Sequence, residues 1–406
     1  NYTEARSIGI GTGTTNSIGQ GHGTACASLA AGKNFGLAFE ADIWNMSCVG
    51  ADATGTSIVT SYELINLFHQ LKPVNATTSV KNPTVINASW GYQAAFNTSS
   101  TVNYKFRGAT GSFTGNASVT NQVTAMKDGL NNQVSGAYRS WSTSSRSSST
   151  DTAATETFYN VTGIHNVAAA GNNNQRLGIG SSDVDRLNYM TDAFYGTTDP
   201  RSEFPSGTVP CNHRDWMLPQ GAGFVASVDS EFHPTICVGA MDDTVNSDLS
   251  ERKASYSNNG PGIDVWAPAD ETLAAGTNGA SGYTDYQRRD NSLFYDARFS
   301  GTSAAAPVVA GLVALYLEGN PTATQRQVQD FIKSNGSVTV ASSLYQDQHS
   351  DDSQTNYWTG SYNLRGASRR IARDLSASSV KPAIKGGFTG TKHLSITGLN
   401  LSIKHK

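Results

Sequence analysis

Short apolar segments alternate with helix-like segments along most of this 406-residue chain, and this alternation constrains the fold more than any other feature. The predicted strands are 41–49, 84–90, 164–170, 235–240 and 263–267. The predicted helices are 22–32, 61–72, 151–162, 302–318 and 323–334. Such alternation is typical of a parallel sheet covered by helices on both faces. The sequence therefore predicts an α/β fold.

Polar stretches interrupt this pattern and indicate insertions. The predicted insertions, which are rich in Ser, Thr, Asn and Gly or lack a clear period, are 93–150, 173–233 and 270–298. They explain why only 37% of residues are apolar and 15% are charged. No segment approaches the roughly 18 uninterrupted apolar residues of a spanning helix, so we expect no membrane span. Cys211 and Cys237 flank a loop-rich stretch and are candidates for a disulfide, although four cysteines without metal-ligand spacing do not require one.

The end of the chain differs in charge from the rest. Residues 361–406 carry nine Lys/Arg against one acidic residue, whereas the whole chain has a net charge of −3. Residues 386–405 alternate apolar and polar positions between glycines, which favours a β-hairpin. We expect a domain over 1–340 and a basic, β-rich extension over 341–406. The extension would serve assembly into a larger particle or, in the simpler alternative, lie as a solvated tail on an acidic body.

Three short segments combine residue types that acyl-transfer chemistry needs. Ser303 follows Gly301 and Thr302 at the start of an apolar helix, where unpaired N–H groups and the helix dipole favour a developing oxyanion. His22 also lies at a helix start and has the side chain of a general base. Asn172 follows a strand and has an amide that can donate to an oxyanion. Taken singly, the serine reads as an N-cap, the histidine as a structural residue and the asparagine as a turn residue.

The ordered set GHGTACA (21–27), AAAGN (168–172) and GTSAAAP (301–307) resembles the subtilase (subtilisin-like, S8) family of serine peptidases. The similarity extends over about 22–335. It implies a three-layer fold with a central parallel sheet. It also implies Ser303 as nucleophile, His22 as general base, and Asn172 with the Ser303 N–H as oxyanion hole. The implied substrate-binding residues, which would form an apolar pocket, are Ser89, Trp90, Gly91, Ala170 and Gly171. Cys26, one turn after His22, resembles the cysteine found beneath the histidine in thiol-containing members.

The family pattern also requires an aspartate on a strand before the histidine, and this chain has none there. Glu4 is the only acidic residue that precedes His22. We expect the aspartate to lie on a segment upstream of Asn1. Two alternatives stay open: a cleaved segment that remains bound as a separate peptide, and a pseudo-peptidase without the carboxylate. Loss of the carboxylate lowers kcat by about 10⁴-fold, because the imidazole is then not held in the required tautomer.

The sequence thus leaves competing functions. The first is a serine endopeptidase acting on peptides or proteins, and the second is a non-catalytic or self-processed structural subunit. A serine esterase is a weaker third. The resemblance implies no required cofactor, although Asp183 and Asp185 are candidate ligands for a structural Ca²⁺. We expect an extracellular or particle-associated protein.

Overall fold

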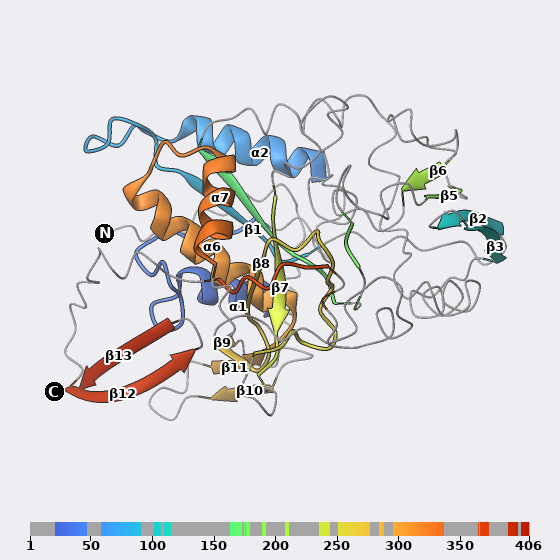
Figure 1. Cartoon of the computed structure of the whole chain (residues 1–406). Coiled ribbons are helices and arrows are strands. Elements are labelled where there is room, and N and C mark those ends of the chain that lie inside the picture. Colours follow the sequence, from blue (N-terminus) through green and yellow to red (C-terminus); the bar gives the residue numbers. More distant parts are fainter. Residues whose placement is uncertain are drawn as a thin grey trace.

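A computed structural model describes the helices and strands of the chain between His22 and His405 (Figure 1). The described residues are 21–46, 58–90, 101–106, 109–114, 163–172, 174, 176–178, 189–191, 208–210, 235–243, 251–276, 284–287, 295–336, 364, 366–372, 389–396 and 399–405. The predicted helix at 151–162, and Gly91, Asp183, Asp185, Cys48 and Cys211, lie outside these residues.

Four parallel strands form the central sheet in the order β1-β4-β7-β8. They are β1 (Thr84–Ala88), β4 (Ile164–Ala169), β7 (Ile236–Met241) and β8 (Val265–Pro268). Ala88 pairs with Ala168, Ala168 with Cys237, and Val238 with Val265, so the carboxyl ends of the strands lie at one edge. The predicted α/β fold with a parallel sheet is confirmed, and β1 is an edge strand of the described sheet.

Alternate residues of each central strand enter two different buried clusters. Val167 and Val238 belong to the cluster beneath α6 (Thr302–Gly319), whereas Ala168 and Cys237 belong to a cluster on the opposite face. The second face is covered in part by the segment 364–372, whose Ile371 pairs with Trp266. Burial on both faces explains why these strands read as continuous apolar runs in the sequence.

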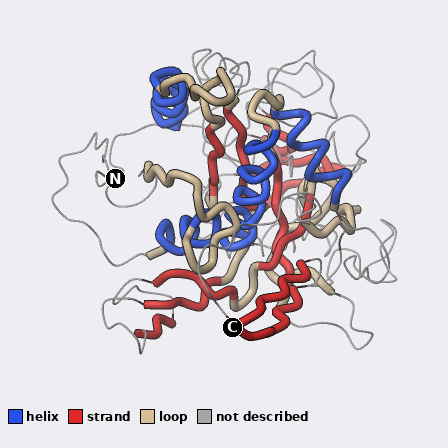
Figure 2. Tube along the Cα trace, turned by 90° about the vertical axis from the view of Figure 1, so that its left-hand side faces the viewer, coloured by secondary structure: helices blue, strands red, loops and turns tan. Residues whose placement is uncertain are grey.

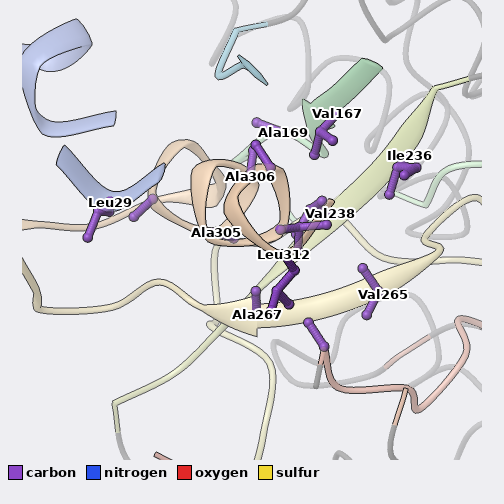
Figure 3. Close-up of a cluster of buried hydrophobic side chains, with 14 of the residues drawn as sticks. Leu29, Val167, Ala169, Ile236, Val238, Val265, Ala267, Ala305, Ala306 and Leu312 are labelled. Atoms are coloured by element: carbon purple, nitrogen blue, oxygen red, sulfur yellow. The ribbon is translucent and has the colours of Figure 1, made fainter. Parts of the chain in front are cut away.

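The long helix α6 is the centre of the first cluster, and its small residues explain why (Figure 3). Ala305 and Ala306 are fully buried against the strands, together with Val309 and Val313 further along the helix. At Gly311 an added Cβ would lie 2.8 Å from the carbonyl oxygen of Ala30 on α1 (His22–Ala31). Because Gly311 has no side chain, the backbone of α6 can approach the backbone of α1 closely at this point.

The two remaining helices lie near the ends of the strands. Helix α7 (Gln325–Asn335) begins with a capping box, in which Thr324 and Gln327 exchange side-chain to backbone hydrogen bonds. Helix α2 (Ile58–Leu71) places His69 within 2.9 Å of the Thr84 hydroxyl at the start of β1. All four predicted helices in the described residues are confirmed, and α2 begins three residues earlier than expected.

Three further sheets lie outside the parallel one, and several of their strands are red in the lower part of Figure 2. The first contains β9 (Thr272–Gly276), β10 (Thr284–Gln287) and β11 (Tyr295–Phe299). The second contains β2 (Thr101–Phe106), β3 (Ala109–Thr114), β5 (Tyr189–Thr191) and β6 (Thr208–Pro210). The third is the hairpin of β12 (Thr389–Ile396) and β13 (Leu399–His405), as the sequence predicted.

The structure corrects two expectations and leaves a third open. Residues 41–46 are exposed and are not a strand, because no neighbouring strand pairs with them among the described residues. The stretch 93–150 contains the β2–β3 hairpin rather than loop alone. Cys237 is buried, and its suggested link to Cys211 stays a prediction because Cys211 lies outside the described residues.

Helix α6 also bears on the expectation that no segment spans a membrane. Within the described residues, it is the one helix whose length and mean hydropathy are sufficient to cross a bilayer. Most of it is buried, since 61% of the apolar window is covered by the rest of the protein. Its apolar character is therefore explained by its central place in the core.

Candidate active site

Ser303 lies at the first turn of α6, at the carboxyl edge of the central sheet. The turn before it is formed by Gly301, whose φ of 103° is a conformation that side chains disfavour. The Ser303 side chain is half-buried. Its N–H lies in the first turn, where backbone donors have no partner within the helix. The residue thus combines a hydroxyl with an unpaired backbone donor at the positive end of a buried helix.

Ser89, the residue after β1, contacts Ser303 in both directions. The Ser303 hydroxyl donates to the Ser89 carbonyl at 3.2 Å, and the Ser89 hydroxyl donates to the Ser303 carbonyl at 2.9 Å. Asn87 donates from Nδ2 to the Ser89 hydroxyl at 2.9 Å. Trp90 follows and packs against the second buried cluster. The end of β1 therefore holds the Ser303 backbone.

Asn172 has an amide of fixed orientation. Its Oδ1 accepts hydrogen bonds from the Thr302 N–H at 2.9 Å and from the Thr302 hydroxyl at 2.8 Å. The same hydroxyl accepts from the N–H of Gly171 at 3.0 Å. Because Oδ1 is occupied twice, the Nδ2 group of the exposed Asn172 side chain is left as a donor beside the turn at Gly301.

Ala170 and Gly171 follow β4 and lie against the side chain of Asn258. Ala170 is 2% exposed, and its carbonyl accepts from Asn258 Nδ2 at 2.7 Å. Gly171 has a φ of 98°, and a Cβ there would lie 2.6 Å from Asn258 Nδ2. Both residues shape the backbone that leads to Asn172, and only Gly171 is partly accessible.

His22 is the first residue of α1, and its ring contacts β11 and its own helix. The ring meets Phe299 of β11 edge to face, with centroids 5.3 Å apart. Nδ1 lies 3.8 Å from Cys26 Sγ, one helical turn away. Burial lowers the pKa of His22, so the imidazole is neutral at neutral pH. A neutral imidazole is the form that accepts a proton from a hydroxyl.

Cys26 joins the two halves of the site. Its thiol donates to the Ser303 carbonyl at 3.5 Å and lies beside the His22 ring. Burial raises the pKa of the Cys26 thiol to about 11, so the thiol is protonated at neutral pH and is no nucleophile. The sequence expectation of a small packing residue beneath the histidine agrees with this environment.

The structure thus brings His22 and Ser303 into contact with the same thiol, that of Cys26, with Asn172 next to the serine turn. The Ser303 hydroxyl donates to Ser89, and among the described residues it has no hydrogen bond to the His22 ring. Hydrogen bonds of this kind often tighten only when substrate binds. No carboxylate in the described ranges contacts His22. The expected pocket residue Gly91 lies outside these ranges.

One functional residue was missed by sequence reasoning. Thr302 locks the amide of Asn172 through both its N–H and its hydroxyl. Its place beside Ser303 in the GTSAAAP segment was the signal that could have identified it. Its partner lies 130 residues earlier, so the pairing itself has no local signal.

An acidic cluster lies near the serine side. Asp242, Asp243 and Asp270 each bring one carboxylate oxygen within 4.8 Å of the others. Oxygen donors of this kind suit a hard cation such as Ca²⁺, but Arg252 already pairs with Asp242 at 2.7 Å. Burial, with the neighbouring carboxylates Asp243 and Asp242 as further causes, raises the pKa of Asp270.

The chain resembles known proteins. The model of the Subtilase family matches residues 5–356. Subtilisin amylosacchariticus of Bacillus subtilis subsp. amylosacchariticus is 34% identical over 128 residues, which are 31% of this chain and 27% of that protein. An extracellular protease of Xanthomonas campestris pv. campestris is 43% identical over 82 residues, or 20% of this chain and 13% of that protein. A solved cold adapted subtilisin-like serine proteinase has 18% identity and a TM-score of 0.40, covering 88% of this chain and 75% of its own.

Proposed function

The chain belongs to the subtilase family, and from this premise we propose that it is a serine endopeptidase that forms an acyl-enzyme at Ser303. The observation that carries the proposal is the locked amide of Asn172 beside the unpaired N–H of Ser303. Two fixed donors next to one hydroxyl are the arrangement that acyl transfer needs. The aligned stretch covers only about a quarter of the length of the first subtilisin relatives, so activity and substrates are proposed.

The proposed reaction uses residues of this chain in four steps. His22 takes the proton of the Ser303 hydroxyl as Oγ attacks the scissile carbonyl. Asn172 Nδ2 and the Ser303 N–H stabilise the oxyanion of the tetrahedral intermediate. His22 then gives the proton to the leaving amine, and the acyl-enzyme forms. His22 then takes a proton from a water that attacks the ester, and it gives that proton to Ser303 Oγ as the bond to the acyl carbon breaks and the acid product leaves.

His22 needs a carboxylate on its Nδ1 side for full activity. We propose that a separate or upstream segment supplies it, because no aspartate precedes His22 in this sequence. Among the described residues β1 lies at the edge of the parallel sheet, which supports a further strand next to the site, since a sheet edge is a ready template for one more strand. The weak contact between Nδ1 and Cys26 at 3.8 Å leaves that nitrogen available for a stronger partner.

The substrate side of the proposal is an extended peptide with a bulky apolar residue before the cleaved bond. Ser89, Trp90, Gly91, Ala170 and Gly171 remain the proposed pocket residues, with Ser89 supported by its contact to Ser303. Because a relative is described as an extracellular protease, we propose that this chain also acts outside the cell. Assembly through the basic extension 341–406 is proposed on its charge alone.

The proposed catalytic steps use no metal. Calcium would have a structural role, as expected for a family whose members commonly bind it. Among the described residues the acidic cluster of Asp242, Asp243 and Asp270 offers oxygen donors. Chelation of such an ion would lower thermal stability before it lowered the rate of the chemical step.

Covalent labelling tests the function directly. A fluorophosphonate probe should modify Ser303 in the full chain, and peptide mapping should place the adduct there. The Ser303→Ala variant should not be labelled and should lose about 10⁵–10⁶-fold in kcat, the scale of a lost catalytic serine. His22→Ala should remove labelling by a similar factor, since the hydroxyl then has no general base.

The structural-subunit alternative predicts a different result. A folded protein without labelling at Ser303, and with no change on Ser303→Ala, would overturn the peptidase function. Intact mass of the native material separates the sources of the carboxylate. A co-purifying peptide with an Asp-Ser-Gly or Asp-Thr-Gly sequence would indicate a bound cleaved segment, and a longer single chain would indicate an upstream one.

A further inference from the structure

The loop 251–260 between β7 and β8 contacts both segments that form the serine side of the site. Asn258 donates from Nδ2 to the carbonyl of Ala170, and its N–H donates to the carbonyl of Gly171 at 2.9 Å. Lys253 is fully buried beneath the loop, and its ammonium donates to the carbonyls of Ala254, Ser255 and Ser257. The loop is therefore held rigidly from inside and lies against the strand end that leads to Asn172.

Tyr256, at the turn of this loop, reaches the other segment. Its hydroxyl accepts a hydrogen bond from the N–H of Gly301 at 2.9 Å. Its backbone carbonyl accepts from the N–H of Asn174 at 2.7 Å. One residue thus contacts the turn before Ser303 and the loop after Asn172, two segments that are about 130 residues apart in the chain.

Among the described residues, the Gly301 N–H has no hydrogen-bond acceptor in a helix or strand, so the Tyr256 hydroxyl is its acceptor. Gly301 is buried and lies in the N-cap position of α6, where no side chain caps the helix. A Cβ at Gly301 would lie 3.1 Å from Asn172 Nδ2 and 3.7 Å from the Ser303 N atom. A small shift of Gly301 therefore changes the distance between the two proposed oxyanion donors.

The hydroxyl proton of Tyr256 has its own acceptors. The carbonyl of Ala269 and the Oδ1 atom of Asp270 each lie 3.4 Å away. Burial raises the pKa of Tyr256 well above the usual tyrosine range, so the group is a neutral hydroxyl at every working pH. The oxygen lone pair that faces Gly301 is thus always available as an acceptor.

We propose that Tyr256 is a positioning residue of the peptidase reaction, whose hydroxyl fixes Gly301 and so sets the geometry of Ser303 and Asn172. The inference rests on the proposed function, because it names a residue that tunes the same site. Tyr256 does not contact the reacting atoms and acts through the turn. Its effect is expected on the chemical step rather than on substrate affinity.

The test compares Tyr256→Phe with Tyr316→Phe in the full chain. Tyr316 lies on α6, is half-buried and stacks on Phe331 with centroids 3.9 Å apart, which makes it a matched control. Tyr256→Phe should lower kcat and the rate of fluorophosphonate labelling about 3–10-fold, the range of one lost hydrogen bond, with KM changed less than 2-fold. Tyr316→Phe should change neither rate.

Amide hydrogen exchange tests the contact between Tyr256 and Gly301 independently of whether the protein is a peptidase. In Tyr256→Phe the Gly301 N–H loses its acceptor, and its exchange should become about 3–10-fold faster whether or not the protein is active. Unchanged exchange at Gly301 in Tyr256→Phe would overturn the inference. So would an unchanged labelling rate in Tyr256→Phe when the wild type is itself labelled. Absence of labelling in the wild type would count against the proposed function, and faster exchange would then still support the tyrosine contact.

Discussion

The serine side and the histidine side of the candidate site are built very differently. Ser303 and Asn172 are held by a closed set of hydrogen bonds of 2.8–3.2 Å through Ser89 and Thr302. His22 is held by an aromatic contact and by a thiol 3.8 Å away. The N-cap residue of α1, Gly21, has a left-handed conformation, and no side chain caps the helix. The proposed oxyanion hole is therefore preorganised by the described residues, whereas the proposed general base has no carboxylate partner among them.

Substitution of Asn172 should have the largest effect among the variants that test the difference between the serine side and the histidine side. Asn172→Ala removes the one side-chain donor of the oxyanion hole, so we expect kcat to fall about 10²–10³-fold at little change in KM. Steady-state kinetics on a peptide substrate measure both constants. Asn174→Ala, two residues further along, is the matched control and should keep kcat within about 3-fold. An equal loss in both variants would mean that Asn172 acts on folding rather than on the oxyanion.

Removal of the buried ammonium should have the next largest effect. Lys253→Met leaves three loop carbonyls without their donor in a dry environment, and we expect the free energy of unfolding to fall by about 3–5 kcal/mol. Arg298→Met is the control, because Arg298 pairs with Glu271 at the surface and should cost at most about 1 kcal/mol. Denaturant unfolding compares the two. Equal costs would contradict the idea of a rigid serine side.

Acid should weaken the core through His165 on β4. Burial lowers the pKa of His165 to about 4, so the folded protein keeps a neutral imidazole while the unfolded chain binds a proton near pH 6.5. Stability should therefore fall as the pH drops from about 6.5 to about 4, by about 3 kcal/mol, and change no further below that range through this group. Unfolding curves at several pH values test this. His165→Asn should flatten the slope, and an unchanged slope would exclude His165 as its source.

Cys26 should have the smallest effect. Cys26→Ala removes weak thiol contacts of 3.5 and 3.8 Å and a small buried volume, so we expect a loss of about 1 kcal/mol in unfolding free energy. Activity should change less than about 3-fold, because the thiol neither donates to the oxyanion nor holds His22 strongly. Leu29→Ala, a buried position on the same helix, should cost about 2–4 kcal/mol and provides the scale. A 100-fold loss of activity in Cys26→Ala would show that the histidine side depends on the thiol.

Local sequence patterns were enough for the elements buried on both faces. Strands β4, β7 and β8 and helix α6 were predicted within one or two residues, since continuous burial leaves a continuous apolar signal. The hairpin β2–β3 was missed because its residues, such as Ser112 and Gly111, are common in loops. The segment 41–46 reads as a strand, yet it has no neighbour to pair with among the described residues.

In the candidate site, too, local patterns predicted some features and missed others. Ser303, His22 and Asn172 were found from short motifs, because each motif fixes a turn at an element boundary. The contacts that hold them join positions far apart, as Ser89 and Ser303 are separated by 214 residues. Neither Thr302 nor Tyr256 has a pattern that reveals its partner, since these hydrogen bonds form only after the sheet brings the strand ends together.

The glycine contact between α1 and α6 has a geometric consequence. Gly311 lies eight residues after Ser303, and the Ala30 carbonyl that it touches lies eight residues after His22, about 12 Å along each helix. The contact at Gly311 therefore fixes how closely α1 and α6 approach each other. A methyl group added at Gly311 would push the two helices apart, so the separation of the proposed nucleophile and the proposed base depends on a contact far from either residue.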